Sequence, residues 1–520
     1  MCIRLEHDSH RMFTLRNNFH VGFQMYTQLT FGHDKIENEW GLVDIYDENG
    51  KPTNYVAVRR YLPSYKILDE LLKTKKLVGL CAYENFPEVS KNPHDNEYMK
   101  SEENDILKKY GNKIILWCHC FKTPTQFIPP GTPLLLQSDS DHYRNRDNLM
   151  KKADTVEKKY DFFCSLPNGD WNYWIRGGDV AKKWLNYMAD TMKLTILVGG
   201  GDKQEGFSDL IQFTGFLPWD KYTDAMNTCK YMFNASRYDA SPRIVIEALS
   251  LNIPVLLNQD ILGGWKYINS STGSFFFYDE PIETAIKRFM NGSYKPKEWI
   301  HLNLSRERSM KLLANTLHTI VSRRYEEFVD GIVCINLLKN KEKHKTNIDF
   351  ETIEIPSSLV HYIEEEALDV DCQYYRKSVY HVKALELAKE KKWGKFMIIE
   401  SNFVFDLVKE RVLYVLSQFY THFPNWDVFM LTTFWKNFHN TELDFIKKIQ
   451  NATTVSGYMV QSNYIDTLIE NFKEAGCLRK EEFQQKRTIE TSFAIDQRWA
   501  TLQKRDNFYI SVPYIGKFVN

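Results

Sequence analysis

Short apolar runs alternate with amphipathic segments along most of the chain. The first part predicts strands at 77–82, 113–118 and 133–137 and a helix at 65–73, and the strand signal before residue 60 is poor. A second series predicts strands at 160–164, 194–198, 211–214, 231–235 and 254–257, with helices at 179–192, 219–229 and 242–251. This alternation is typical of parallel sheets covered by helices. We therefore predict an α/β fold in which the second series forms a complete doubly wound unit.

The length of the chain calls for more than one domain, because 520 residues exceed what one ordinary core fills. A helix at about 305–328 closes the second series, and the apolar run 331–336 opens a third. We expect three domains, over 1–158, 159–328 and 329–520.

Composition narrows the class of protein. Lys and Arg total 67, and so do Asp and Glu, so the chain lacks the positive field of general nucleic-acid binders. No apolar stretch approaches the roughly 20 residues that span a bilayer, and the charged start lacks the apolar core of a secretory signal. The nine scattered cysteines form no Cys-x-x-Cys pair and are expected as reduced thiols. We expect a cytoplasmic protein with no nucleic-acid partner and no membrane span.

The most informative stretch joins a strand to a helix near residue 240. Ser241 and Pro242 suit the cap and the first position of a helix, whose free N–H groups and dipole attract a diphosphate. Arg243 adds positive charge. Asp239 in the loop and Glu247 in the helix would flank this anion site and accept hydrogen bonds from sugar hydroxyls. The alternative is structural: Asp239 caps a loop, Glu247 is solvated and nearby glycines only make turns.

The spacing Asp239-x7-Glu247 resembles the E-x7-E motif of retaining, family 4-like glycosyltransferases with the GT-B fold of two Rossmann-like domains. The runs 197–201, 213–218 and 231–236 resemble the segments that precede that motif. The resemblance implies that Glu247 binds the ribose of a nucleotide-sugar donor, that Asp239 lies beside the transferred sugar, and that this module needs no metal. Asp239 is one methylene shorter than the family's Glu. Further positions that the resemblance assigns to the donor are Gly199, Gly200, Gly215, Arg176 and Lys182 or Lys183.

His119 ends the strand predicted in the first domain, at the edge where open α/β sheets bind ligands. A histidine is similarly placed in many GT-B enzymes, so His119 is a catalytic candidate, and a purely structural histidine remains the alternative. Zinc binding with Cys118 and Cys120 is disfavoured, because side chains alternate along a strand and the histidine points away from both cysteines.

The third domain resembles a second family, the family 25 glycosyltransferases, including versions found in large DNA viruses. The segments 335–343, 381–385, 426–431, 454–460 and 495–499 follow in family order. The resemblance implies a GT-A-like domain. Its candidate site residues are Lys339, Lys343, His381, Glu400, Asn402 and Asp496.

The run Glu400-Ser-Asn402 departs from the family's E-D-D, whose carboxylates hold a divalent cation for the donor diphosphate. Only one of three carboxylates is retained, and hard cations such as Mn²⁺ or Mg²⁺ prefer charged oxygens. Either Asp406 or Asp496 completes a metal site with Glu400 and Asn402, or the domain has lost turnover and keeps binding. Glu400 as a plain strand-end acid and His381 as a packing residue are the structural alternatives.

These observations predict a hexosyltransferase that moves a sugar from a nucleotide-sugar donor to a glycan or glycoprotein acceptor. If the chain is viral, it would act in the host cytoplasm. Two alternatives remain open: a nucleotide-sugar epimerase or hydrolase on the same fold, and a carbohydrate-binding scaffold made of decayed transferase modules.

Overall fold

A computed structural model describes residues 42–46, 52–59, 66–80, 106–126, 128–142, 145–336, 350–363, 372–434, 436–485 and 494–519. They form two compact units. Unit 1 draws on 1–109, 116–127 and 134–318, and unit 2 on 110–115, 128–133 and 319–520. The division into three domains at 158 and 328 stays a prediction.

The first sheet has the strand order β1-β2-β3-β4-β5. Its strands are β1 (Leu42–Tyr46), β2 (Pro52–Arg59), β3 (Lys76–Leu80), β4 (Ile114–His119) and β5 (Leu134–Leu136), accompanied by helices α2 (Lys66–Leu71) and α4 (Ile106–Tyr110). The next helix, α5 (Arg146–Lys152), packs in the core of the second sheet. The pairs β2–β3 and β4–β5 are parallel, and β1–β2 is antiparallel. Two strands, β1 and β2, lie before residue 60, where the strand signal in the sequence is poor. The usable signal was the run from Tyr55 to Val58, all four of which are buried although β2 opens with the weak strand formers Pro, Thr and Asn.

The second sheet is fully parallel, in the order β11-β10-β9-β6-β7-β8. Its strands are β6 (Tyr160–Ser165), β7 (Ile196–Gly199), β8 (Gln212–Phe213), β9 (Cys229–Asn234), β10 (Val255–Asn258) and β11 (Gly273–Phe276). This confirms the predicted doubly wound unit, with ends shifted by a few residues and with one further strand, β11, that was not predicted. From β6 the chain adds β7 and β8 on one side, and it then adds β9, β10 and β11 on the other side. The carboxyl ends of β6 and β9 therefore form the topological switch point, where such sheets bind ligands.

Helices cover both faces of the second sheet. Side chains of α7 (Gly178–Asp190) and α10 (Ile282–Met290) share one core with it, and those of α8 (Trp219–Asn227), α9 (Arg243–Ser250) and α11 (Pro296–Asn303) share another. Two further helices are α6 (Asp170–Ile175), which follows β6, and α12 (Arg306–Val321).

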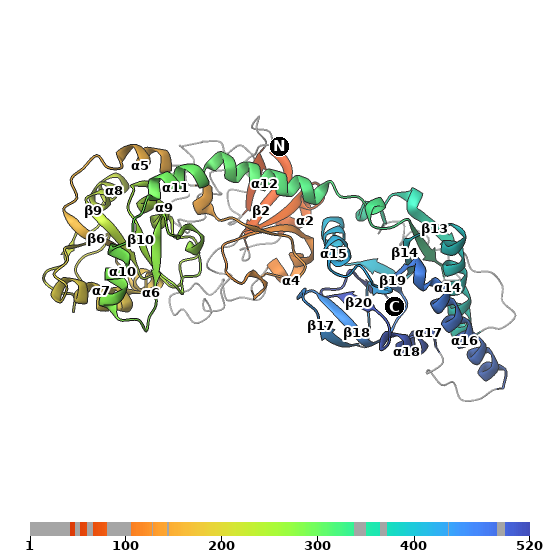
Figure 1. Cartoon of the computed structure of the whole chain (residues 1–520). Coiled ribbons are helices and arrows are strands. Elements are labelled where there is room, and N and C mark those ends of the chain that lie inside the picture. Colours follow the sequence, from red (N-terminus) through yellow and green to blue (C-terminus); the bar gives the residue numbers. More distant parts are fainter. Residues whose placement is uncertain are drawn as a thin grey trace. The chain divides into compact units, whose positions relative to one another are not determined.

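Unit 2 contains an eight-stranded mixed sheet in the order β13-β12-β14-β19-β16-β20-β18-β17 and a two-stranded pair, β15–β21. The strands are β12 (Gly331–Ile335), β13 (Val360–Ile363), β14 (Lys395–Glu400), β15 (Phe403–Phe405), β16 (Val428–Met430), β17 (Lys436–Asn440), β18 (Ile446–Ala452), β19 (Gly457–Gln461), β20 (Phe508–Ser511) and β21 (Gly516–Phe518). Helices α14 (Gln373–Glu390) and α16 (Ile465–Gln484) pack side by side on one face (Figure 1), and α15 (Lys409–His422) packs on the other. Two short helices, α17 (Ile495–Arg498) and α18 (Ala500–Gln503), precede β20.

Arg411 on α15 joins three separate stretches of unit 2. Its buried guanidinium donates to the carbonyls of Gly131 (2.9 Å), Gly111 (3.1 Å) and Pro130 (3.0 Å), with a longer bond to Ile114 (3.4 Å). Burial lowers the pKa of Arg411 to about 10, so the side chain is still charged at neutral pH. A buried charge is tolerated here because carbonyl oxygens on three sides accept its hydrogen bonds.

Within the described residues, no helix is long and apolar enough to cross a membrane. The seven cysteines in this part of the chain are free thiols.

Candidate functional site

An ion pair occupies the switch point of the second sheet. Arg176, after β6 and α6, donates through Nη1 to Oδ2 of Asp239, which follows β9. The Asp239 side chain is only 9% exposed, while that of Arg176 is 25% exposed. Two residues 63 positions apart thus meet at the one crevice where this fold class binds ligands.

Gly177 explains how Arg176 reaches that position. Its φ of +65° lies in the left-handed region, and a Cβ at this residue would lie 2.3 Å from the carbonyl oxygen of Ala235. Only glycine permits both the turn and the close approach to the end of β9. The loop that carries Arg176 is therefore held against the strand that leads to Asp239.

The start of α9 differs in one detail from the sequence expectation. Pro242 is the cap rather than the first helical residue, and no side chain caps the helix. The Ser241 hydroxyl instead bonds to Ser140 (2.8 Å) and Ser138 (3.1 Å). Since those partners take the hydroxyl, the first N–H groups of α9 have no side-chain cap, and they remain suited to an anion.

Glu247 lies inside α9 and is 4% exposed, so the alternative of a solvated helix residue is wrong. Trp219 donates its indole N–H to Oε1 of Glu247 at 3.0 Å, and Arg243 lies 3.8 Å from the same oxygen. These contacts fix the orientation of the carboxylate near the first turn of the helix.

His119 is buried at the end of β4, and its Nδ1 has no hydrogen-bond partner among the described residues. Burial, with a smaller effect from the charge of Lys266, lowers the pKa of His119 to about 4. The imidazole is therefore neutral at pH 7. It can accept or donate a hydrogen bond but brings no positive charge to a diphosphate.

Other buried polar atoms at this edge also lack partners. Among the described residues these include Nε of Arg176, Nδ2 of Asn234 and Oγ of Ser236, all near the carboxyl ends of β6 and β9. Buried polar groups are rarely left unsatisfied, so this concentration indicates a site for a polar ligand.

The remaining predicted donor residues have mainly structural contacts. Gly199 packs against Phe163 and Tyr222, where a Cβ would come within 3 Å of both rings. Gly200 and Gly215 adopt φ values of +90° and +64°. The Lys182 ammonium donates to the carbonyl of Glu205 (2.7 Å), which directs it to the loop after β7 and not to the Arg176–Asp239 pair. For Lys183 no contact places it at the pair, and its role stays a prediction.

Sequence reasoning missed three side chains at this edge. Trp174 and Tyr238 stack at 4.1 Å between ring centroids, tilted by 8°, and each is next or nearly next in sequence to a member of the ion pair. Lys266 binds Asp141 (2.5 Å) and the carbonyl of Leu136 (3.2 Å). The adjacency of Tyr238 to Asp239 was a usable signal, whereas nothing local marks Lys266.

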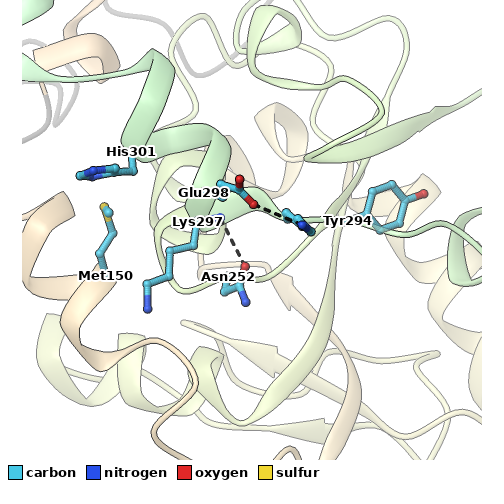
Figure 2. A pocket seen from close by; sticks show the side chains of 7 residues that line it. Met150, Asn252, Tyr294, Lys297, Glu298 and His301 are labelled. Atoms are coloured by element: carbon cyan, nitrogen blue, oxygen red, sulfur yellow. Dashed lines mark hydrogen bonds and ion pairs between the residues drawn. The ribbon is translucent and has the colours of Figure 1, made fainter.

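A separate open pocket of about 450 Å³ lies at the start of α11 (Figure 2). It is lined by Met150, Asn252, Tyr294, Lys295, Lys297, Glu298 and His301. Asn252 belongs to the turn that enters β10, so the pocket faces the amino ends of the strands. Its lysines are paired, Lys295 with Glu298 (3.5 Å) and Lys297 with Asp154 (3.6 Å). We place the candidate site at the switch point, where unpaired polar groups converge, and not here.

The candidate site of unit 2 is a buried charge network around Glu400, at the end of β14. Lys377 on α14 contacts both carboxylate oxygens (2.9 and 3.0 Å), His381 donates to Oε1 (3.2 Å) and Ser456 to Oε2 (3.2 Å). The Tyr458 hydroxyl donates in turn to Nδ1 of His381 (2.9 Å). His381 and Glu400 are thus neither a plain packing residue nor a plain strand-end acid.

The other predicted site residues of unit 2 do not all lie at this network. Asp496 is electrostatically coupled to Lys377 and Glu400, and Oδ1 of Asn402 is buried without a partner among the described residues. Asp406 is bound instead by Asn112 (2.6 Å) and Lys517 (2.9 Å). Lys339 and Lys343 lie outside the described residues.

A divalent cation does not fit Glu400. Its oxygens already accept from an ammonium, an imidazole and a hydroxyl, and a metal ion there would lie beside the charge of Lys377. Among the described residues, no three of His, Cys, Asp and Glu gather as metal ligands. The assignment of Glu400 and Asn402 to a metal stays a prediction, which the occupied oxygens of Glu400 disfavour.

Stability is expected to depend on pH through Glu400. Burial alone would raise its pKa, but the bond from His381 and the charge of Lys377 bring the pKa down from 4.5 to about 2. Because the pKa of this carboxylate is lower in the folded than in the unfolded protein, its charge stabilises the fold at pH values above the unfolded pKa. This stabilisation is lost as the pH falls towards 2. Urea unfolding between pH 6 and pH 2 should show this loss, about 3 kcal/mol, in the wild type. The same pH series on Glu400→Gln should lack it, and equal slopes would contradict the assignment.

Neither a protein-family model nor a curated protein matches the chain. Among solved structures, S. aureus TarM, determined with UDP, is 13% identical over 47% of this chain and 51% of that one, with a TM-score of 0.36. Sucrose-phosphate synthase of Thermosynechococcus elongatus is 10% identical over 53% and 75%, with a TM-score of 0.38. The pneumococcal O-GlcNAc transferase GtfA is 11% identical over 54% and 63%, with a TM-score of 0.32. The chain spans half to three quarters of these structures, and the reaction has to be inferred from the site itself.

Proposed function

We propose that the chain is a glycosyltransferase of the hexosyltransferase type, which transfers a sugar from a nucleotide-sugar donor to a glycan or glycoprotein acceptor. One observation carries the proposal. The Arg176–Asp239 ion pair and the start of α9, with no side-chain cap, lie together at the switch point of a parallel, doubly wound sheet. An arginine and helix N-terminal N–H groups that no side chain caps suit a diphosphate, and a carboxylate beside them suits sugar hydroxyls.

The proposed chemistry needs only residues of unit 1. The donor diphosphate lies at the start of α9 and takes Arg176 as a partner, while Glu247 accepts hydrogen bonds from the ribose and Asp239 faces the transferred sugar. The acceptor oxygen bonds to the anomeric carbon as the bond to the diphosphate oxygen breaks, and the acceptor's proton passes to the leaving diphosphate. Fixed N–H groups and Arg176 stabilise the charge on that leaving group. Retention of configuration follows from the E-x7-E resemblance.

His119 completes the proposed site from the first sheet. Its neutral imidazole, with Nδ1 lacking a protein partner among the described residues, suits a hydrogen bond to a hydroxyl of the donor sugar or the acceptor. Because both sheets of unit 1 contribute residues to one proposed ligand site, we assign unit 1 to the GT-B fold.

For unit 2 we propose a GT-A-like domain related to family 25, of the type found in large DNA viruses. Sequence resemblance supports this, together with a sheet whose parallel strands β13, β12 and β14 are followed by antiparallel β19. A cytoplasmic location belongs to the same proposal.

The test is a panel of nucleotide sugars incubated with the full chain, with and without glycan acceptors and with and without EDTA. Transfer detected by mass spectrometry, dependent on one donor and unaffected by EDTA, supports the proposal. Donor consumption without an acceptor would indicate an epimerase or hydrolase instead. Glycan binding without nucleotide release from any donor would indicate a scaffold.

Glu247→Ala is expected to weaken the use of the donor. Loss of hydrogen bonds between a charged acceptor and the ribose costs about 1.5–3 kcal/mol, which corresponds to a tenfold to 150-fold lower kcat/KM for the donor. Steady-state kinetics measure the effect, and thermal unfolding checks the fold. The matched control is Glu298→Ala, which removes an exposed glutamate on α11 and should leave kcat/KM unchanged. Wild-type kinetics in a folded Glu247→Ala protein would remove Glu247 from the site.

A further inference from the structure

We infer that Lys377 is a resident cation of unit 2: its ammonium holds the place on Glu400 that a divalent metal ion would need, so the site at the end of β14 works without metal. The inference concerns unit 2 and does not depend on the transfer reaction proposed for unit 1.

The hydrogen-bond capacity of Glu400 is the first argument. An ionised carboxylate has about four lone-pair positions. Oε1 accepts from His381 and lies 2.9 Å from the Lys377 ammonium, and Oε2 accepts from Lys377 and Ser456. All four contacts lie between 2.9 and 3.2 Å, so no position is left for a metal ion.

The second argument is how firmly these partners are held. Glu400 is 1% exposed and His381 is fully buried. Since the carboxylate only accepts, His381 carries its proton on Nε2, and Nδ1 accepts from the Tyr458 hydroxyl. The backbone N–H of Glu400 is bound to the carbonyl of Ser456 (2.8 Å). The carboxylate cannot turn towards a metal ion without leaving buried donors unsatisfied.

Nearby oxygens do not supply an alternative metal site. Asp406 is engaged by Asn112 and Lys517, and two candidate ligands remain, Asn402 and Asp496. Asp496 lies near a fixed positive charge, because Lys377 acts on it electrostatically. A divalent ion bound between them would be repelled by the ammonium.

The exposure of Lys377 indicates where a ligand would bind. Its side chain is 26% exposed, against 1% for Glu400. Two contacts of the ammonium go to the carboxylate, and an ammonium has three N–H groups. The third can donate to an oxygen of a ligand. Such binding would be insensitive to chelators, unlike binding through a metal ion.

Mn²⁺ titration of the full chain, followed by electron paramagnetic resonance, tests the inference. The variants are Ser401→Asp/Asn402→Asp, Lys377→Met, and the triple variant that combines these changes. The wild type and the double variant are expected to add no Mn²⁺ site that involves Glu400, since both keep Lys377. The triple variant should gain one site, bound at least tenfold more tightly than any Mn²⁺ in the double variant.

Lys383→Met is the matched control, because Lys383 lies on the same helix with its ammonium over the Tyr380 ring. It should gain no Mn²⁺ site in the Ser401→Asp/Asn402→Asp background. Two results would overturn the inference: a wild-type Mn²⁺ site that Glu400→Gln abolishes, or a double variant that binds Mn²⁺ as tightly as the triple variant. The first result uses only proteins that keep Lys377, so it decides the question even if Lys377→Met fails to fold.

Discussion

Glu400→Gln is expected to destabilise unit 2 by about 3–5 kcal/mol at pH 7, the usual cost of removing one partner from a buried ion pair. The amide keeps the size of the side chain but removes its charge, which leaves the Lys377 ammonium without a counter-charge. The N–H₂ group of the glutamine would also take the place of one carboxylate oxygen and would face donors there. Those donors are Lys377 and His381 at the Oε1 position, or Lys377 and Ser456 at the Oε2 position.

Chemical unfolding with a probe in unit 2 measures this loss. Glu386→Gln on α14, the helix that carries Lys377, is the control, because Glu386 forms an exposed pair with Lys473 at 2.8 Å, and such pairs contribute about 0–1 kcal/mol. If the two variants were equally stable, the network around Glu400 would be a surface-like ion pair and the argument for a resident cation would fail.

Arg411→Met is the second large effect. Methionine fills similar space and adapts its shape, but the carbonyls of Gly111, Pro130 and Gly131 lose the guanidinium donors. Each buried acceptor left unsatisfied costs about 1–3 kcal/mol, so a loss of about 3 kcal/mol or more is expected in the free energy of unfolding.

Hydrogen exchange gives a local readout for the same variant. Amides of 110–115 and 128–133 should exchange faster in Arg411→Met, because these stretches are joined to α15 through the guanidinium. Arg505→Met, which removes an exposed partner of Asp506, should leave those amides unchanged. Unaltered exchange in Arg411→Met would show that other contacts hold the stretches.

The sequence allowed the second sheet and one half of its site to be predicted, because the signals were local. Asp239 and Glu247 lie eight residues apart on a strand–loop–helix connection, and apolar runs marked the strands around them. The partner of Asp239 could not be derived in this way. Arg176 reaches it only because Gly177 turns the chain against Ala235, a contact between distant segments.

The network of unit 2 shows the same limit. Lys377 and His381 are four residues apart on α14, which places both on one face, but nothing local in the sequence indicates that this face meets the end of β14. Motif comparison drew attention to positions 400–402, where the family has three acids, and to a metal. The lysine that contacts both oxygens of the remaining acid comes from a helix 23 residues earlier.

The make-up of unit 2 has a consequence for synthesis on the ribosome. Residues 110–115 and 128–133 belong to it, yet they leave the ribosome almost 300 residues before the Arg411 side chain that binds their carbonyls. During translation these stretches cannot form their contacts with Arg411 until most of unit 1 has been synthesised. A gene fragment that starts at 329 would encode Arg411 without its carbonyl partners, so unit 2 is better produced from the intact reading frame than as a separate piece.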